Sequence, residues 1–124
     1  ARADLFLDTF NSNAHTTASD ALWAGLPLVT RPGQGFAARV GASLLHAVGL
    51  PELIAADTAG YEALALALAR DPARLAAIRA KLAESRTHAP LFDTTRFTRG
   101  IEAAYETACE RYRNGLAPAD FTIG

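Results

Sequence analysis

The sequence predicts an α/β fold in which parallel strands alternate with helices. Two short apolar runs, Leu5–Leu7 and Leu26–Thr30, have the pattern of strands that are buried on both faces of a parallel sheet. Between them, Thr16–Ala24 lacks glycine and proline and carries apolar residues at helical spacing. Trp23 lies in this helix and is expected to belong to the core. Strand, helix and strand form a βαβ unit, which indicates a doubly wound sheet with right-handed crossovers.

The alternation continues through the middle of the chain. Phe36–Val48 has apolar side chains at four-residue steps, which predicts a second helix packed on the sheet. Leu53–Ala55 follows as a weaker third strand. We expect the three strands to be parallel neighbours, with their carboxyl ends at one edge of the sheet.

The rest of the chain predicts helices alone. Thr58 is a candidate cap for the first of them. Asp71 and Pro72 begin the next, because aspartate caps helices and proline is well tolerated at the first helical position. Asp93 or Thr94 caps a long final helix. We therefore expect one lobe over residues 1–115, cut from a longer protein, and a tail over residues 116–124.

Composition and charge exclude several classes of function. A chain of 124 residues, half of them hydrophobic, can form one domain with a real core. The net charge of −1 is spread over 12 basic and 13 acidic residues, so no basic face for nucleic acid is expected. No apolar run approaches the ~20 residues of a membrane span, so no membrane partner is expected. The single cysteine, Cys109, is expected to pack in a helix, which favours a reducing compartment and a cytoplasmic protein.

The main candidate site lies where the first predicted strand leads into the first predicted helix. The helix entry at Thr16 and Thr17 offers backbone N–H groups, a helix dipole and two hydroxyls to an anion, and His15 adds a third donor. Asp20 lies about one turn further on, where a carboxylate can accept hydrogen bonds from a ribose diol. This order suits a nucleotide at the carboxyl edge of a sheet. A structural explanation is also open, in which a threonine caps the helix and His15 is a surface residue.

A second candidate is the turn after the second predicted strand. Gly33 and Gly35 fit the G-x-G-x-x-A form of a dinucleotide fingerprint, and Asp57 follows the next strand. A tight structural turn explains the glycines equally well. Arg31 and Arg39 flank this turn, and Arg39, near a helix start, is the better placed to reach an anion. Arginines in such places also pair with nearby carboxylates or stay solvated.

Metal chemistry has no support in the sequence. His46 and His88 have no partner at metal-ligand spacing, and no Cys/His cluster is present. No nucleophile elbow or P-loop occurs either. We therefore expect no metal and no cofactor.

A long ordered run of residues joins several of these features. It begins at Asp8-Thr9 and continues through Asn13-Ala14-His15-Thr16-Thr17, Asp20, Leu22-Trp23-Ala24-Gly25, Pro27 and Val29-Thr30. The run resembles the C-terminal catalytic region of the O-GlcNAc transferases and their bacterial relatives. The resemblance continues, nearly to Tyr112, through Pro32-Gly33, Ala38-Arg39-Val40 and Pro90-Leu91-Phe92-Asp93-Thr94.

The resemblance implies a fold, a substrate and roles for residues. The fold would be the Rossmann-like C-terminal lobe of a GT-B glycosyltransferase, followed by C-terminal helices. The enzyme would transfer a sugar with inversion from a UDP-sugar, typically UDP-GlcNAc, to Ser or Thr of an acceptor protein, without a metal. Thr16 and Thr17 match positions that hold the diphosphate, His15 one beside it, and Asp20 one near the ribose. In an inverting transfer the helix entry with Thr16, Thr17 and His15 would then stabilise the charge of the leaving diphosphate.

The same resemblance implies that much of the enzyme lies outside this chain. The N-terminal catalytic half and the tetratricopeptide repeats of the parent chain would be its partners, so the fragment alone is expected to be inactive. Some plant and bacterial relatives use GDP-fucose or UDP-glucose, which leaves the sugar open.

Two other interpretations remain. The first is an NAD(P)-binding Rossmann domain that uses Gly33, Gly35 and Asp57. The second is a noncatalytic helical interaction module, in which Phe97, Tyr105 and Tyr112 form an exposed apolar stripe for a partner.

Overall fold

The computed structural model describes residues 3–123. The chain divides between Ala89 and Pro90 into two compact units, of which the first contains both strands and the second contains the long C-terminal helix. The predicted division into a lobe over residues 1–115 and a tail over residues 116–124 stays a prediction.

The first unit contains a small parallel sheet. β1 (Phe6–Leu7) pairs in parallel with β2 (Leu28–Val29), with Phe6 opposite Leu28. Beyond β2, Thr30 forms a parallel bridge to Ile54. The predicted parallel arrangement is therefore confirmed, but the sheet is smaller than expected and the described chain is mostly helical.

The third predicted strand is only partly correct. Ile54 makes a bridge, whereas Leu53 belongs to the 3-10 helix η2 (Pro51–Leu53). Proline at the first position of this turn has a fixed φ that favours a helical start. The local preference of Pro51 therefore delays the strand by one residue.

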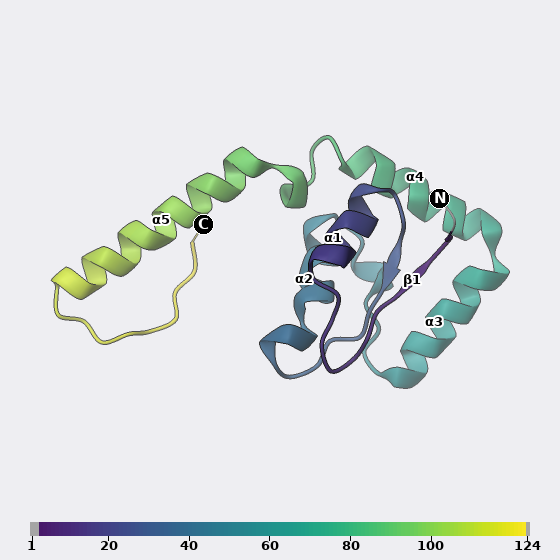
Figure 1. Ribbon diagram of the computed structural model, residues 1–124, viewed down its shortest axis with the longest axis horizontal. Coiled ribbons are helices and arrows are strands. Elements are labelled where there is room, and N and C mark those ends of the chain that lie inside the picture. The colour runs from purple at the N-terminus through teal and green to yellow at the C-terminus, as the bar shows by residue number, and fades with distance from the viewer. Residues whose placement is uncertain (1–2, 124) are drawn as a thin grey trace. The chain divides into compact units, whose positions relative to one another are not determined.

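Helices flank the strands in the first unit. Figure 1 shows the strands between α1 (Thr16–Trp23) and α2 (Val40–Ala47) on one side and α3 (Thr58–Arg70) on the other. The fourth helix, α4 (Pro72–Ser85), contacts α3. The helix predicted over Phe36–Val48 is divided into η1 (Phe36–Ala38) and α2, because the chain leaves helical geometry at Arg39.

The core of the first unit is made of leucines and valines from every layer. The fully buried side chains include Leu22 of α1, Leu28 and Val29 of β2, Leu45 of α2, Leu68 of α3 and Leu82 of α4. Burial of each leucine contributes about 1.5–3 kcal/mol. These side chains join the short sheet and the helices in one core.

Trp23 does not belong to this core. Its side chain is 51% exposed, and the Arg86 guanidinium lies 4.6 Å from the centre of its ring. Neighbouring helical residues point about 100° apart, so Leu22 faces the strands and Trp23 cannot. The prediction that Trp23 is a core residue was wrong for this reason.

Three of the helices begin with an aspartate cap. The Asp57 carboxylate accepts from the Gly60 N–H at 2.7 Å at the start of α3. Asp71 caps α4 and Asp93 caps α5 (Thr94–Arg113) in the same way. The predicted caps at Asp71 and Asp93 are confirmed, whereas Thr58 is the first residue of its helix and Asp57 provides the cap.

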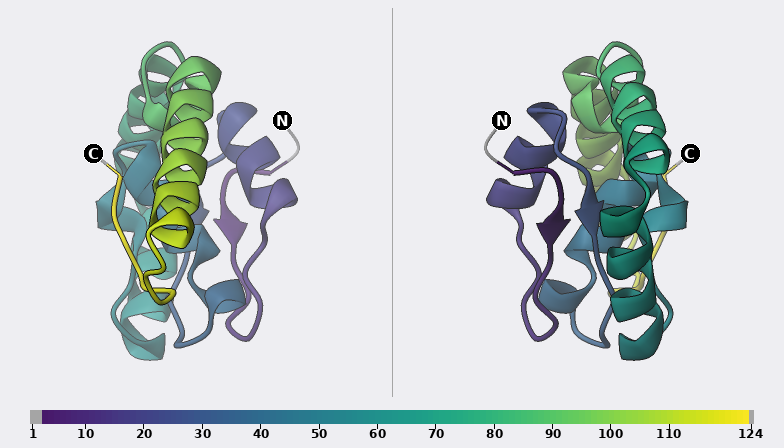
Figure 2. Two further views of the ribbon diagram at one scale, coloured as in Figure 1. Left: turned by 90° about the vertical axis from the view of Figure 1, so that its left-hand side faces the viewer. Right: turned by 90° about the vertical axis from the view of Figure 1, so that its right-hand side faces the viewer.

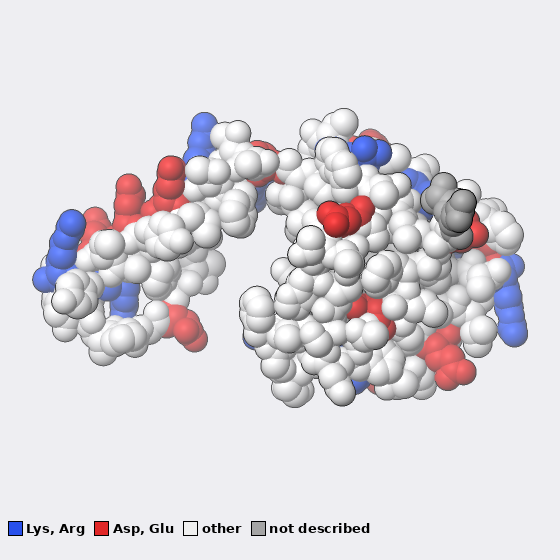
Figure 3. Space-filling model, in the orientation of Figure 1, with Lys and Arg blue, Asp and Glu red and all other residues white. Residues whose placement is uncertain are grey.

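The second unit consists of the short 3-10 helix η3 (Pro90–Phe92), α5 and the C-terminal residues. No residue of α5 is buried, and Phe97, Tyr105 and Tyr112 are 66%, 66% and 86% exposed. Cys109 is also exposed, so its predicted packing role was wrong. In Figure 3, charged side chains of both signs are seen along this unit.

No helix within residues 3–123 combines the length and the apolar character needed to cross a membrane. On the face of the first unit in Figure 3, acidic and basic side chains are scattered and do not form one charged surface.

Candidate functional site

Two loops meet at the carboxyl end of the parallel strands. The first loop (residues 8–15) connects β1 to α1, and the second loop (residues 31–39) leads from β2 through η1 to α2. Figure 1 and Figure 2 show them side by side at the lower end of the strands. Open α/β sheets bind their ligands at this edge.

The predicted site residue His15 contacts the second loop. Its Nε2 lies 3.3 Å from the Ala37 carbonyl oxygen, and its ring stands edge-on to Phe36 with 6.0 Å between the ring centres. Because a carbonyl only accepts hydrogen bonds, Nε2 carries the proton in this contact. The other ring nitrogen, Nδ1, makes no hydrogen bond within the described chain.

The start of α1 is uncapped. His15 occupies the cap position, but its side chain accepts no hydrogen bond from the first turn. Thr16 and Thr17 are exposed, and within residues 3–123 their hydroxyls have no hydrogen-bond partner. The backbone N–H groups and both hydroxyls are thus available to a ligand at this helix end.

Asp20 is exposed on the same helix. It follows Thr16 by four residues, which places it about 6 Å further along the helix axis. Its carboxylate also has no hydrogen-bond or ion-pair partner in the part of the chain that the structure describes. The structure therefore places four exposed residues, His15, Thr16, Thr17 and Asp20, at the cap position and in the first turns of α1.

The turn of the second loop is built by close packing. The Gly33 N–H donates to the Ala38 carbonyl at 2.7 Å, and a Cβ at Gly33 would lie only 2.7 Å from the Ala38 Cβ. Arg39 is exposed at the start of α2. Arg31 instead stacks on Phe10 of the first loop, with 4.7 Å between guanidinium and ring centre. Gly33 thus has a steric role, and Arg39 is the arginine that is free to meet a ligand.

The acidic residue that the dinucleotide interpretation requires, Asp57, has a structural role instead. The carboxylate of Asp57 caps α3, and Gly33 and Gly35 lead into a short 3-10 helix before α2 begins. Within residues 3–123, no group of three or more histidine, cysteine or carboxylate side chains is arranged to hold a metal ion.

Asp8 is a residue of this region that we did not predict. It follows β1 directly and is only 4% exposed. Its Oδ1 accepts from the N–H groups of Thr9 and Ala14 at 2.9 and 2.7 Å, and its Oδ2 accepts from the Thr30 hydroxyl at 2.6 Å. The sequence signals for it are a carboxylate placed directly after a buried strand and its place at the start of the segment that carries the family resemblance.

Asn13 is a second buried residue of the first loop, also 4% exposed. Its side-chain amide donates to the Thr9 carbonyl at 2.8 Å and accepts from the Gly41 N–H at 3.1 Å. Its backbone N–H donates to the Ala37 carbonyl at 2.7 Å. The first loop is therefore fastened both to itself and to the second loop.

Tyr61 of α3 supports the first loop from another direction. Its hydroxyl donates to the Asp8 carbonyl oxygen at 3.0 Å, and its ring meets Phe10 edge-on with 5.0 Å between centres. Burial, and then the nearby Asp8 carboxylate, raise the pKa of the Tyr61 phenol. The phenol thus stays protonated at neutral pH and keeps its donor.

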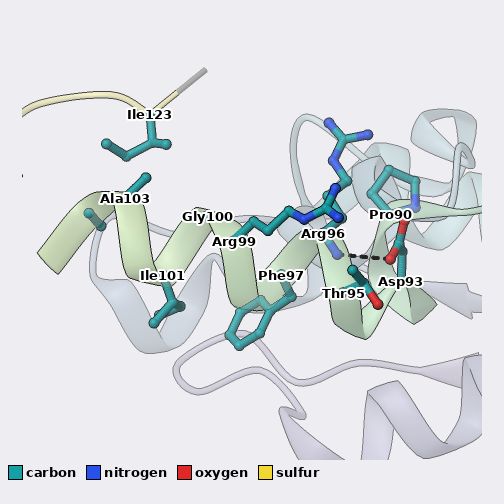
Figure 4. A pocket seen from close by; sticks show the side chains of 11 residues that line it. Pro90, Asp93, Thr95, Arg96, Phe97, Arg99, Gly100, Ile101, Ala103 and Ile123 are labelled. Atoms are coloured by element: carbon teal, nitrogen blue, oxygen red, sulfur yellow. Dashed lines mark hydrogen bonds between the residues drawn. The ribbon is translucent and has the colours of Figure 1, made fainter. Parts of the chain in front are cut away.

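A groove of a different character lies along α5 in the second unit. Figure 4 shows its lining by one side of the helix and by Ile123, with Asp93 bonded to the Arg96 N–H at one end. It contains none of the predicted site residues.

Three comparisons relate the chain to known proteins. The profile of Glycosyl transferase family 41 matches residues 1–101. The chain is 40% identical over 114 residues to the UDP-N-acetylglucosamine–peptide N-acetylglucosaminyltransferase of Caenorhabditis elegans, covering 92% of this chain and 10% of the relative. It is 42% identical over 116 residues to the SPINDLY relative of Hordeum vulgare, covering 94% of this chain and 12% of the relative.

The fold agrees with a solved structure as well. A mutant of the Thermobaculum terrenum O-GlcNAc transferase matches with a TM-score of 0.75 and 36% identity, over 82% of this chain and 20% of that chain. The chain therefore spans only about a tenth of the two relatives compared by sequence.

Proposed function

The chain belongs to Glycosyl transferase family 41, the O-GlcNAc transferase family, and from this we propose that it is the nucleotide-sugar-binding part of an inverting glycosyltransferase. The sugar is GlcNAc or a related sugar, the donor is a UDP-sugar, and the acceptors are Ser and Thr residues of proteins. We place the chain in the Rossmann-like C-terminal lobe of a cytoplasmic GT-B enzyme. The N-terminal catalytic half and the repeat domain of the parent chain complete the enzyme.

The observation that supports this proposal most is the uncapped start of α1 at the carboxyl end of two parallel strands. Free N–H groups and the positive end of the helix dipole attract a diphosphate. The hydroxyls of Thr16 and Thr17 add two uncommitted donors beside them. Together these groups can hold a diphosphate without a divalent cation.

The same groups suit the chemistry of the transfer. An acceptor hydroxyl attacks the anomeric carbon from the side opposite the diphosphate, the bond from sugar to phosphate breaks, and the nucleoside diphosphate leaves with the bonding electrons. Donors fixed near the leaving oxygen stabilise the growing charge more in the transition state than in the bound donor. The acceptor proton goes to a base that the rest of the enzyme must provide.

His15 stands beside the diphosphate in this proposal. The contact of its Nε2 with the Ala37 carbonyl orients the ring, and Nδ1 makes no hydrogen bond within the described chain. We assign leaving-group stabilisation to His15, and ribose binding to Asp20.

The residues of the second loop have lesser parts in the proposal. Arg39 is exposed at the start of α2 and is a further candidate contact for the diphosphate. Gly33 shapes the turn by its close packing against Ala38.

Calorimetric titration of the full-length parent enzyme tests this function. We expect UDP to bind and NADH not to bind. Asp20→Ala should weaken UDP binding by roughly 1–2 kcal/mol, the range for a hydrogen bond to a charged group. The matched control is Asp71→Ala, which removes an exposed carboxylate of the same unit that caps α4 and should leave UDP affinity unchanged. Binding of NADH in place of UDP would refute the proposal.

A further inference from the structure

We propose that Asp8 is a positioning residue of the nucleotide site, whose buried carboxylate fixes the loop that carries His15 and the start of α1. This inference rests on the proposed function, because it concerns the same site. Asp8 itself is only 4% exposed and both of its oxygens are engaged within the protein. It therefore acts through the loop and does not touch the substrate.

One oxygen of Asp8 closes the first loop on itself. Oδ1 accepts from Thr9, at the beginning of the loop, and from Ala14, near its end. A single atom thus holds the two ends of the loop together. Since Ala14 precedes His15 directly, this contact sets the direction in which the chain enters α1.

The other oxygen attaches the loop to the neighbouring strand and helix. Oδ2 accepts from the Thr30 hydroxyl at the end of β2. Gly41 of α2 packs directly against this pair, because a Cβ there would overlap Oδ2 and lie 2.8 Å from the Thr30 hydroxyl oxygen. The space around the carboxylate is therefore filled, and the carboxylate has little freedom to move.

Two more contacts hold the loop at separate points. Asn13 accepts from the Gly41 N–H, and the Tyr61 hydroxyl donates to the Asp8 carbonyl oxygen. Asp8 stands at the centre of this arrangement, since it is linked to β2 through its side chain and to α3 through its backbone. The first loop is consequently attached to the end of β2, to α2 and to α3. The position of the loop in turn determines the positions of His15, its last residue, and of Thr16, which follows it directly.

Such precision matters for a transfer reaction. Misplacement of catalytic groups by about 1 Å can cost about 100-fold in rate. Loss of the Asp8 contacts would release both ends of the first loop. The residues that we propose to contact the nucleotide would all still be present. We therefore expect a folded enzyme in which His15 and the start of α1 are present but less precisely positioned.

The test uses Asp8→Asn in the full-length parent enzyme, which keeps the size of the side chain and removes its charge. We expect UDP to bind about 10-fold more weakly, and kcat to fall at saturating donor as well. Hydrogen–deuterium exchange over residues 9–16 should become faster, because the N–H groups of Thr9 and Ala14 lose their charged acceptor.

Ser85→Ala is the matched control for a purely structural role. The Ser85 hydroxyl is buried in the same unit and donates to the Val48 carbonyl at 3.0 Å, outside both loops. Its loss should destabilise the unit without changing UDP affinity or exchange over residues 9–16. Equal effects of Ser85→Ala and Asp8→Asn on UDP affinity would overturn the proposal.

Substitutions of Thr30 provide an independent arm if Asp8→Asn fails to fold. Thr30→Ser keeps the hydroxyl donor to Asp8 and should preserve binding, whereas Thr30→Val removes it and should weaken UDP binding in the direction of Asp8→Asn. Where Asp8→Asn and Thr30→Val both fold, the double variant should lose less UDP affinity than the sum of the two single losses, because both substitutions remove the same contact. Wild-type binding by Thr30→Val would count against the proposal.

The outcomes separate this inference from the proposed function. If Asp20→Ala weakens UDP binding and folded Asp8→Asn does not, only the positioning role is wrong. If the wild-type parent does not bind UDP, the proposed function fails and the inference about its site fails with it.

Discussion

The start of α1 and the starts of α3, α4 and α5 solve the same physical problem in different ways. Every helix leaves its first N–H groups without intrahelical partners. Asp57, Asp71 and Asp93 provide an acceptor at three of these helix ends, at 2.7 to 2.9 Å. At the fourth, His15 stands in the cap position and provides none.

α2 has no aspartate cap either, but the Asn13 side chain accepts from the Gly41 N–H in its first turn. The difference therefore separates helices whose first N–H groups have a side-chain acceptor from α1, whose start has none within residues 3–123. An aspartate cap stabilises a helix by about 1 kcal/mol, but it also occupies the groups that would bind an anion. α1 does without this gain and relies on the burial of Ala18 and Leu22 and on the fixed first loop. The open end is thus maintained by packing and not by capping.

The largest effect is expected when α1 is given the same kind of cap as the other helices. His15→Asp places a carboxylate where a diphosphate would bind, and such a juxtaposition of like charges costs about 2 kcal/mol or more. We expect UDP affinity of the parent enzyme to fall by at least about 30-fold in calorimetry. The thermal stability should stay the same or rise.

The control for this experiment is His15→Asn, which can cap the helix without a negative charge. It should lose less affinity than His15→Asp. Equal UDP affinity of His15→Asp and the wild type would show that the open end of α1 does not face the diphosphate.

A smaller effect is expected when a cap is removed from one of the other helices. Asp57→Ala should cost about 1 kcal/mol at the start of α3 and speed amide exchange in its first turn by about 5-fold. Asp57→Asn should restore most of the protection. UDP affinity should not change in either variant. If Asp57→Ala or Asp57→Asn lowered UDP affinity, the start of α1 would not differ from the start of α3 in its relation to the ligand.

The smallest effect concerns Tyr61, which supports the first loop behind the open helix end. Its pKa is raised above the ordinary value of 10.0 by burial and then by the Asp8 carboxylate. Stability from the protonated phenol is therefore present below about pH 10 and is lost as the pH rises through the folded-state pKa.

Tyr61→Phe should be about 0.5 kcal/mol less stable than the wild type at neutral pH, since one part-buried hydrogen bond is lost. This difference should shrink above about pH 10. Denaturation followed by the fluorescence of Trp23, the single tryptophan, measures it. A constant difference across this range would mean that the hydroxyl contributes nothing that depends on its proton.

Features with a local signal could be predicted from the sequence. The order β1, α1, β2 follows from two apolar runs and one helical stretch, and the caps Asp71 and Asp93 follow from the residue type before each helix. His15, Thr16, Thr17 and Asp20 were named because they are close together in a recognisable run; their roles stay predictions. Nearby residues carry such information, since a few turns of chain fix their relative positions.

Features that depend on distant partners could not be predicted. The contacts of Asp8 and Asn13 that matter most lie 22 and 28 residues away, at Thr30 and Gly41. Trp23 was misassigned because an apolar residue in a helix gives no indication of which side of the helix faces the strands. Thr58 was wrongly assigned as the cap of α3, because the neighbouring Asp57 is the stronger hydrogen-bond acceptor and occupies the cap position.

The sequence separation of these contacts also has a consequence for folding. The first loop is completed by Gly41 and by Tyr61, which lies 53 residues from Asp8. Contacts of such separation form only after much of the chain has ordered, so the loop takes its shape together with the whole first unit. A core substitution far from the proposed nucleotide site would then lower the fraction of binding-competent molecules, and with it the apparent affinity for UDP, without altering any residue of that site.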